Sequence, residues 1–251
     1  MTAVEIGQAV GFIGLGQIGR PMALRLADWP GGLWVHDVDA EAVAALENAG
    51  AKVAATPREL AERARVVSVM VRDDEQVRAV LEGPDGVLAG AAPGTCVVLH
   101  STIHPGTAVQ LAEAAAEQGV HVVDAPVSGG FMGAQDGRLA IMVGGSEEAF
   151  AASREALERM GAVVVHLGPA GAGTRAKLAR NLVHFVAFTA VTEAQRIAEA
   201  AGIDLQALGN VVRHTDSVTG GPGAIMLRET AAPLDPDDGW YPVLDHVRAL
   251  G

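Results

Sequence analysis

A chain of 251 residues, 49% of them hydrophobic, is long enough for one large or two smaller domains with apolar cores. Its formal net charge of -12 argues against a nucleic-acid or membrane partner, because both anionic surfaces attract an excess of Lys and Arg. No secretory signal and no run of roughly 18 apolar residues occurs, so we expect a cytoplasmic protein with a small-molecule partner.

The chain opens with a predicted strand, glycine turn and helix. Ala9–Ile13 is a short apolar run, and Arg20–Ala27 has helical apolar spacing. Between them lie Gly14, Leu15, Gly16, Gln17, Ile18 and Gly19. Such a turn lets the backbone approach a pyrophosphate at Gly16 and packs helix on strand at Gly19. We therefore predict that these six residues bind a dinucleotide.

Asp37 ends the next predicted strand, Leu33–Asp37, at about the 20-residue interval expected after such a turn. A carboxylate there hydrogen-bonds the ribose hydroxyls and repels a 2′-phosphate, which favours NAD over NADP. The alternative is that Asp37 caps the helix Ala40–Ala49, a role for which Asp39 is better placed.

Strands and helices continue to alternate through the first half. The expected elements are the helix Glu59–Arg65, the strand Val66–Val71, the helix Asp74–Glu82, the strand Cys96–Leu99, the helix Thr107–Gln118 and the strand His121–Asp124. This alternation predicts a doubly wound, Rossmann-like parallel sheet. Ligands gather at the carboxyl ends of its strands, so the residues to inspect there are Met70, Val71, Arg72, Ser101, Thr102 and Asp124–Gly130. Of these we assign Met70, Val71 and Arg72 to cofactor binding.

The second half changes character after one more sheet-like stretch. We expect a strand at Leu139–Val143, a helix at Ser146–Met160, a strand at Val163–Leu167, a hinge at Gly168–Gly173, helices at Thr174–Ala201 and Leu205–His214, a breaker-rich segment at Thr219–Gly223, a proline- and aspartate-rich tail at Ala231–Gly239 and a helix at Tyr241–Leu250. These elements predict a dinucleotide-binding domain at residues 1–168. A helical substrate and dimerisation domain follows at residues 169–251.

Lys177 draws attention because arginine is the usual cation of this chain. Of 18 basic residues, only Lys52 and Lys177 are lysines. A guanidinium cannot release its proton at usable pH, whereas an ammonium desolvated in a cleft can. Asn181 lies one turn further on the same helix face. Both residues are candidates for catalysis, and the alternative is a solvated surface lysine.

Four motifs follow one another along the chain: Gly14–Met22, Ser101–Pro105, Asp124–Gly130 with Gly133, Ala134 and Gly137, and Gly171–Asn181. In order and approximate spacing they resemble the β-hydroxyacid dehydrogenases, the group of 3-hydroxyisobutyrate dehydrogenase, tartronate semialdehyde reductase and, more remotely, 6-phosphogluconate dehydrogenase. The resemblance implies that Ser128, Gly129 and Gly130 hold the substrate carboxylate and that Ser101 and Thr102 lie by the nicotinamide. Of that pair, Ser101 counts as substrate-binding and Thr102 as cofactor-binding. Lys177 and Asn181 would act at the hydroxyl carbon.

The implied activity is hydride transfer between NAD, with NADP the less favoured cofactor, and a small 3-hydroxy acid or its semialdehyde. A serine hydroxyl and the N–H groups of a glycine run suit a carboxylate. A lysine, with an ordinary pKa of about 10.4, serves as base near neutrality only if burial beside the cofactor lowers that pKa. Two alternatives stay open: a catalytically weak dinucleotide-binding protein or sensor, and an imine or ketone reductase on the same fold.

Some features depart from the family pattern. Relatives often have aspartate at Leu99, leucine-proline at Val71-Arg72 and paired asparagines at Arg180-Asn181. Relatives also normally continue beyond Gly251, so we expect an incomplete helical domain whose apolar helix is covered by a second subunit in a homodimer or higher oligomer.

Neither cysteine nor histidine chemistry adds a site. Cys96 is the single cysteine, and its apolar surroundings predict a buried thiol in a strand. His184 and His214 have no second ligand at metal-binding spacing, so we expect no metal.

Overall fold

The computed structural model describes residues 8–227, 231 and 237. The chain divides into two compact units, Met1–Ala179 and Arg180–Gly251. The division falls within a long helix, after the hinge at which the sequence places the domain boundary. The first turns of that helix belong with the first unit, and Gly173 there packs directly against the main chain of Met142 in a strand and of Asp124 at a strand end. The functional roles assigned to the two domains stay predictions.

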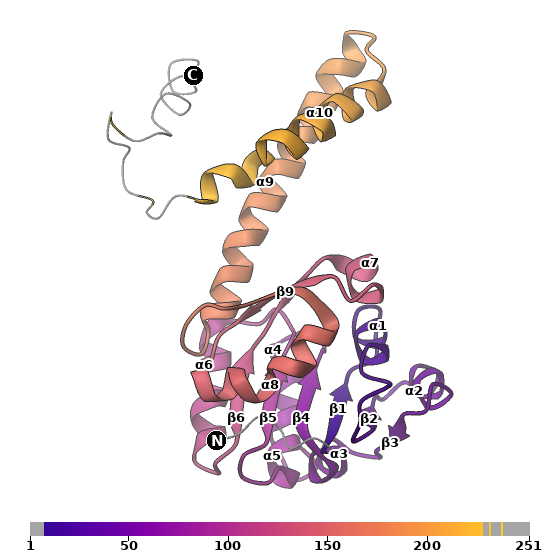
Figure 1. Cartoon of the computed structure of the whole chain (residues 1–251), viewed down its shortest axis with the longest axis vertical. Coiled ribbons are helices and arrows are strands. Elements are labelled where there is room, and N and C mark those ends of the chain that lie inside the picture. Colours follow the sequence, from indigo (N-terminus) through magenta and orange to yellow (C-terminus); the bar gives the residue numbers. More distant parts are fainter. Residues whose placement is uncertain (1–7, 228–230, 232–236, 238–251) are drawn as a thin grey trace. The chain divides into compact units, whose positions relative to one another are not determined.

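A six-stranded parallel sheet forms the centre of the first unit (Figure 1). Its strands are β1 (Ala9–Ile13), β2 (Leu33–His36), β3 (Lys52–Val53), β4 (Ala64–Val69), β5 (Cys96–Leu99) and β6 (His121–Asp124). The order is β3-β2-β1-β4-β5-β6, and every neighbouring pair is parallel. The chain reverses its direction of strand addition between β1 and β4, which is the switch point of a doubly wound sheet. The predicted fold class is confirmed.

Helices flank this sheet, and several begin with a side chain that caps the first turn. They are α1 (Gly19–Leu24), α2 (Ala40–Glu47), α3 (Pro57–Arg63), α4 (Asp74–Leu81), α5 (Val87–Gly90), α6 (Pro105–Ala116), α7 (Gly130–Gln135) and α8 (Glu147–Met160). Asp39 caps α2 by accepting the N–H of Glu41, as expected from the sequence. The predicted helix Glu59–Arg65 is wrong at its end, because Ala64 is extended and pairs with β1.

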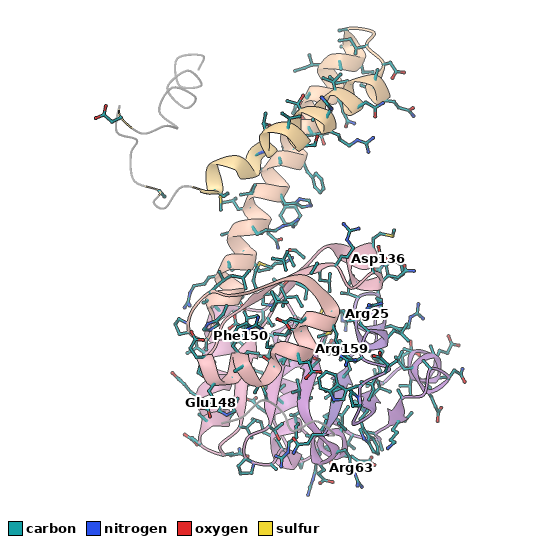
Figure 2. All side chains as sticks on the ribbon, in the orientation of Figure 1. Arg25, Arg63, Asp136, Glu148, Phe150 and Arg159 are labelled. Atoms are coloured by element: carbon teal, nitrogen blue, oxygen red, sulfur yellow. The ribbon has the colours of Figure 1, made fainter. Side chains whose placement is uncertain are left out.

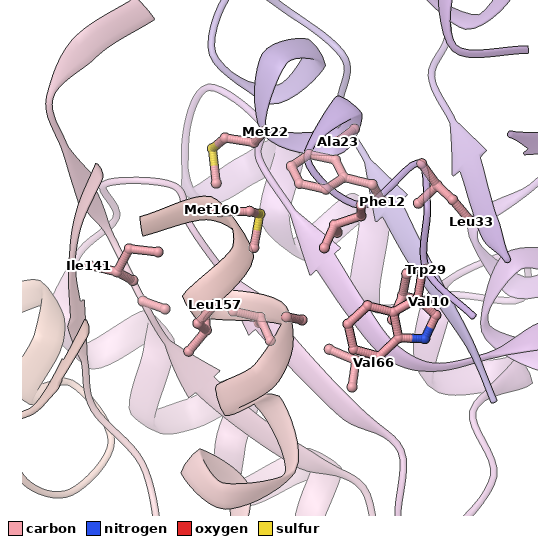
Figure 3. Packing of buried hydrophobic residues seen from close by; sticks show 14 of the residues in the cluster. Val10, Phe12, Met22, Ala23, Trp29, Leu33, Val66, Ile141, Leu157 and Met160 are labelled. Atoms are coloured by element: carbon pink, nitrogen blue, oxygen red, sulfur yellow. The ribbon is translucent and has the colours of Figure 1, made fainter. Parts of the chain in front are cut away.

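Both faces of the sheet are covered, and β5 shows how its sequence achieves this. Its side chains alternate between the two faces. Cys96 and Val98 belong to a core that includes α1, α2 and α8, whereas Val97 and Leu99 belong to a core with α3, α4, α5 and α6. Figure 3 shows Met22 and Met160 beside Phe12 in the first core. Cys96 is the predicted buried strand thiol, and burial raises its pKa to about 12.

Arg159 of α8 connects this helix to the segment after α1. Its guanidinium lies 4.8 Å from the ring centre of Trp29 and 2.8 Å from Asp28 Oδ1. Arg25 approaches the same place and donates to the Arg159 carbonyl at 3.5 Å (Figure 2). Cation–π and ionic contacts therefore hold the end of α8 against the segment that follows α1.

A small second sheet extends the first unit. It contains β7 (Val127–Ser128), β8 (Leu139–Val143) and β9 (Gly161–His166), with β7 antiparallel and β9 parallel to β8. An isolated bridge between Asp124 and Gly144 connects it to β6. Neither β7 nor α7 was expected, since the sequence marks this stretch only as a ligand-binding motif.

Helices make up the described part of the second unit. Helix α9 (Ala172–Ala200) enters from the first unit, and α10 (Leu205–Thr219) and the 3₁₀ helix η1 (Gly221–Leu227) follow. The long predicted helix is confirmed. Helix α10 is longer than expected and ends at Thr219, where the next residue, Gly220, caps it in a left-handed conformation with φ of 83°. The expected helix Tyr241–Leu250 and most of the proline-rich tail lie outside the described residues.

Apolar side chains of this unit are exposed. Between residues 180 and 227, Ala198 is the only buried residue among those with described side chains. The exposed large apolar residues there are Leu182, Phe185, Val186, Phe188, Val191, Ile197, Ile203, Val211, Val212, Val218 and Met226. Across the part of the chain that the structure describes, no helix is both long and apolar enough to span a membrane.

Candidate active site

A pocket of about 610 Å³ opens at the carboxyl ends of the strands beside the switch point. Residues from β1, the glycine turn, β2, α4 and the segments after β2, β4 and β5 line it: Ile13, Gly14, Gly16, Gln17, Ile18, Gly19, His36, Asp37, Val38, Met70, Val71, Arg72, Gln76, Ala79, Val80, Ser101 and Thr102. The lining includes every residue that the sequence assigned to the cofactor except Leu15, whose side chain is buried in the core.

The glycine turn has the geometry that a phosphate-binding turn needs. A Cβ on Gly14, where φ is 90°, would lie 2.2 Å from the Met70 carbonyl oxygen, and one on Gly19 would lie 1.9 Å from that of Gly14. Gly16 has nothing within 4 Å of the corresponding position. Two glycines therefore let α1 pack on the strands, while the third leaves open space where a ligand can approach the backbone.

Asp37 bridges the loop after β2 to the glycine turn. Its Oδ2 accepts the N–H of Leu15 at 2.5 Å, and its Oδ1 accepts the N–H of Asp39 at 2.8 Å. The helix cap is Asp39, so the alternative role for Asp37 as the cap of α2 is not what the structure shows. The half-buried carboxylate instead lies in the pocket lining, beside His36.

Ser101 joins the ends of β4 and β5. Its side chain is buried, and its hydroxyl donates to the Val71 carbonyl at 2.8 Å while accepting the Val71 N–H at 3.0 Å. Thr102, the next residue, is exposed and lines the pocket. The Ser101 hydroxyl thus holds two strand ends together, a contact that the sequence did not reveal.

Lys177 and Ser128 meet in a second cluster of the first unit. The ammonium Nζ donates to the Val127 carbonyl at 2.6 Å and to Ser128 Oγ at 2.9 Å. Both side chains are at least partly buried, so the alternative of a fully solvated Lys177 does not describe this structure. Gly129 and Gly130, with φ of 132° and 61°, lead into α7 immediately after Ser128. None of these four residues lines the pocket of 610 Å³.

Asn181 lies four residues beyond Lys177 on α9 and belongs to the second unit. Its Oδ1 accepts from the exposed Arg180 guanidinium at 3.5 Å. The structure does not place Asn181 against Ser128, so its assigned role stays a prediction.

Two buried polar residues near these clusters had no predicted role: Asp124, which belongs to a motif marked for inspection, and His100, which was not a candidate. Asp124, at the end of β6, accepts the N–H groups of Gly171 and Thr174. His100 follows β5 directly, and the buried apolar run before it was the only sequence signal for its burial. Its Nδ1 lies 2.9 Å from the Ala125 carbonyl oxygen and its Nε2 lies 3.2 Å from Ser68 Oγ.

Burial lowers the pKa of His100 from 6.5 to about 4, although the hydrogen bond to Ala125 acts in the opposite direction. A carbonyl oxygen only accepts, so Nδ1 carries the proton and Nε2 accepts from Ser68. His100 is therefore a neutral link between β4, β5 and the end of β6.

No group of three or more histidine, cysteine or acidic side chains within the described residues could hold a metal ion. The pocket instead offers glycine backbone, the Asp37 carboxylate, the Arg72 guanidinium, and apolar and uncharged polar side chains. A doubly wound sheet with such a turn at its switch point defines a dinucleotide-binding protein, and the open approach at Gly16 fits a pyrophosphate.

Residues 9–168 match the NAD-binding domain of 6-phosphogluconate dehydrogenase. An uncharacterised oxidoreductase of Mycobacterium tuberculosis is 53% identical over 251 residues, which are 100% of this chain and 85% of the relative. A 3-hydroxyisobutyrate dehydrogenase of Pseudomonas aeruginosa is 37% identical over 87% of this chain and 72% of its own length. The chain therefore belongs to the oxidoreductase family of the 3-hydroxyisobutyrate dehydrogenases and related β-hydroxyacid dehydrogenases, with an NAD(P)-binding domain.

Solved structures show the same fold. The 3-hydroxyisobutyrate dehydrogenase of Mycobacterium tuberculosis with L-serine is 31% identical, with a TM-score of 0.76 over 97% of this chain and 88% of that chain. An imine reductase from Myxococcus stipitatus in complex with NAD+ has the same TM-score over 97% and 86% of the two chains. At 21% identity, that second likeness shows the fold alone.

Proposed function

We propose that this protein is an NAD-dependent dehydrogenase or reductase that transfers a hydride between the cofactor and a small 3-hydroxy acid or its semialdehyde. The observation that carries the proposal is the meeting of Lys177 Nζ with Ser128 Oγ at 2.9 Å. A candidate proton carrier thereby lies beside a candidate carboxylate-binding hydroxyl. Family membership supports the class of reaction.

The chain's own residues can divide the work as follows. The Ser128 hydroxyl and the N–H groups of Gly129 and Gly130 bind the substrate carboxylate. Lys177 holds or moves the proton of the substrate hydroxyl, whose oxygen would replace one of the present protein acceptors of Nζ. Asn181 is the expected second hydrogen-bond partner of that oxygen. The pocket residues would hold the dinucleotide, which when bound supplies or accepts the hydride.

The protein should bind NADH more tightly than NADPH, by at least about tenfold, because a 2′-phosphate would face the Asp37 carboxylate. Asp37→Ser should bring the dissociation constants of NADH and NADPH closer together, because it removes the negative charge. Fluorescence titration with both cofactors measures the ratio. Asp39→Ser is the matched control, since serine also caps helices and the preference should not change. Equal or reversed binding by the wild-type protein contradicts the assignment of Asp37.

Ser128→Ala should raise the KM for the acid with only a modest fall in kcat. Loss of one hydrogen bond to a carboxylate costs about 1–3 kcal/mol, or about 5- to 150-fold in kcat/KM. Steady-state kinetics with the preferred acid measures this change. Ser217→Ala, at an exposed hydroxyl of α10, is the control and should be silent. Unchanged inhibition by a non-reacting carboxylate would show that the glycine run is only a loop.

A single substrate panel separates the proposed function from its two alternatives. Small hydroxy acids, semialdehydes, ketones and cyclic imines are offered with NADH or NADPH, or with the oxidised cofactors, and absorbance is followed. Turnover that requires a carboxylate supports the proposal. Turnover of imines or ketones without a carboxylate indicates the reductase alternative, for which the shared fold is the supporting observation. Dinucleotide binding without turnover indicates a sensor.

Two other expectations accompany the proposal. The exposed apolar side chains of α9 and α10 make a second copy of this chain the proposed cover for the second unit, as a homodimer or higher oligomer. Analytical ultracentrifugation tests the oligomer, and a monomer at micromolar concentration contradicts it. A cytoplasmic location also stays a prediction.

A further inference from the structure

Asp124 is a buried carboxylate that holds the start of the helix carrying Lys177. It lies at the end of β6 and is 1% exposed. Its Oδ1 accepts the N–H of Gly171 at 2.7 Å, and its Oδ2 accepts the N–H of Thr174 at 2.6 Å. Each oxygen thus binds one of the N–H groups that the start of a helix leaves without a partner inside the helix.

Two glycines bring the backbones into direct contact at this point. A Cβ on Gly144 would lie 2.4 Å from Asp124 Oδ1, and a Cβ on Gly173 would lie 2.2 Å from the Met142 carbonyl oxygen. The main chain of Gly144 also exchanges two hydrogen bonds with that of Asp124, at 2.7 and 3.0 Å. The first turn of α9 therefore has little freedom to shift against β6 and β8.

One short segment of chain contains both Asp124, which holds the start of α9, and the two oxygen atoms that accept hydrogen bonds from the Lys177 ammonium. Val127 and Ser128 follow Asp124 by three and four residues, and Lys177 follows Thr174 by three. Two hydrogen bonds connect this segment to the helix: the Thr174 N–H donates to Asp124 Oδ2, and Lys177 Nζ donates to Ser128 Oγ. Any movement of the helix start would move Nζ relative to Ser128.

We propose that Asp124 is a positioning residue, which fixes the Lys177 ammonium against Ser128 by holding the first turn of α9. This inference rests on the proposed function, in which Lys177 acts on the substrate. Asp124 does not line the cofactor pocket, and its buried carboxylate is already used by two backbone donors. Its effect on the reaction must therefore pass through the helix.

Asp124→Asn tests the proposal with a readout that needs no turnover. The asparagine amide has the size of the aspartate carboxylate and keeps one acceptor oxygen. Its NH₂ group, however, faces a backbone N–H, so two donors meet and one hydrogen bond to the helix start is lost. Lys52 and Lys177 are the only lysines, so the rate of acetylation by acetic anhydride at Lys177, measured by mass spectrometry, has Lys52 as an internal reference. Labelling of Lys177 relative to Lys52 should rise about fivefold in the variant.

Kinetics with the preferred substrate gives the second readout. For Asp124→Asn we expect kcat to fall roughly 10- to 100-fold, because a displaced catalytic group loses its alignment. The dinucleotide Kd should stay within about twofold, since the pocket is untouched. Asp204→Asn is the matched control: Asp204 caps α10 by accepting the N–H of Ala207 at 2.7 Å. It should change neither the labelling ratio nor kcat.

The outcomes separate this inference from the proposed function. If a folded Asp124→Asn protein keeps the wild-type labelling ratio and kcat, Asp124 is an ordinary helix cap and the inference is overturned. If the wild type turns over nothing in the substrate panel, the proposed function fails, while the labelling ratio still tests whether Asp124 positions Lys177. Should Asp124→Asn not fold, Asp124→Ser, which keeps one short acceptor, undergoes the same two measurements.

Discussion

Lys177→Arg should lower kcat by roughly 10²–10⁴ while leaving dinucleotide binding nearly unchanged. Arginine keeps the positive charge but cannot release its proton, so the proposed exchange with the substrate hydroxyl would stop. The Lys177 ammonium is compact and donates to the Val127 carbonyl and to Ser128 Oγ from a single nitrogen atom. The broader guanidinium of arginine cannot reproduce both hydrogen bonds in this geometry. The limb of the pH–rate profile that depends on the lysine should disappear. Stopped-flow or steady-state kinetics across pH measures both effects.

Lys52→Arg is the matched control, because Lys52 is the other lysine of the chain. Its ammonium lies 5.6 Å from the ring centre of Trp34, a contact that arginine can also make. This variant should be silent. An active Lys177→Arg enzyme with the wild-type pH profile, and with dinucleotide binding and melting that show it is folded, would refute the acid–base role. The fold assignment would not be affected.

Local chemistry explains why the cofactor region could be predicted. The glycine turn is encoded by adjacent residues, because the left-handed φ at Gly14 and the close packing at Gly19 exclude a side chain wherever this turn occurs. The four apolar residues of β5 likewise reveal a strand buried on both faces. The pocket then follows from the general position of ligands in doubly wound sheets.

The sequence could predict which residues belong to the second cluster, but it could not predict the hydrogen bonds that connect them. The hydrogen bonds that Asp124 accepts from the N–H groups of Gly171 and Thr174 connect positions 47 and 50 residues apart. No local pattern marks such a contact, and an aspartate at the end of a strand suits many roles. Family resemblance supplied Ser128 and Lys177, but the direct hydrogen bond between them is a property of the three-dimensional structure.

Errors at element ends have a similar cause. Ala64 and Arg65 have good helical propensity, which favoured continuing α3 to Arg65. In the folded chain, Ala64 instead pairs with Ala9 of β1 and begins β4. Strand β7 has only two residues and depends on pairing with β8, so it has no periodicity to detect. Tertiary pairing overrides local preference in both cases.

His100 should make the first unit sensitive to mild acid. In the unfolded chain its pKa is the ordinary 6.5, whereas burial lowers the pKa to about 4 in the folded protein. The neutral form therefore favours folding, and its full contribution is present above pH 6.5. As the pH falls from 6.5 to about 4, the free energy of unfolding should drop by up to about 3 kcal/mol, because 6.5 − 4 = 2.5 pKa units and each unit is worth about 1.36 kcal/mol.

His100→Asn should remove most of this pH dependence. The asparagine amide can still donate to the Ala125 carbonyl, although Ser68 loses its acceptor, so the variant should be about 1–2 kcal/mol less stable than the wild type at pH 7. The stability difference between the two proteins should then shrink as the pH falls and reverse its sign near pH 4, because the wild type loses up to about 3 kcal/mol and the variant does not. Urea unfolding at intervals between pH 7 and 4 measures the difference. The exposed His214 is the control position, and His214→Asn should keep the wild-type dependence of the unfolding free energy on pH. A constant difference in unfolding free energy between wild type and His100→Asn over this range would contradict the prediction. It would show that His100 is protonated as easily in the folded protein as in the unfolded chain. Its buried hydrogen bonds to Ser68 and Ala125 would then have to accommodate the charged ring.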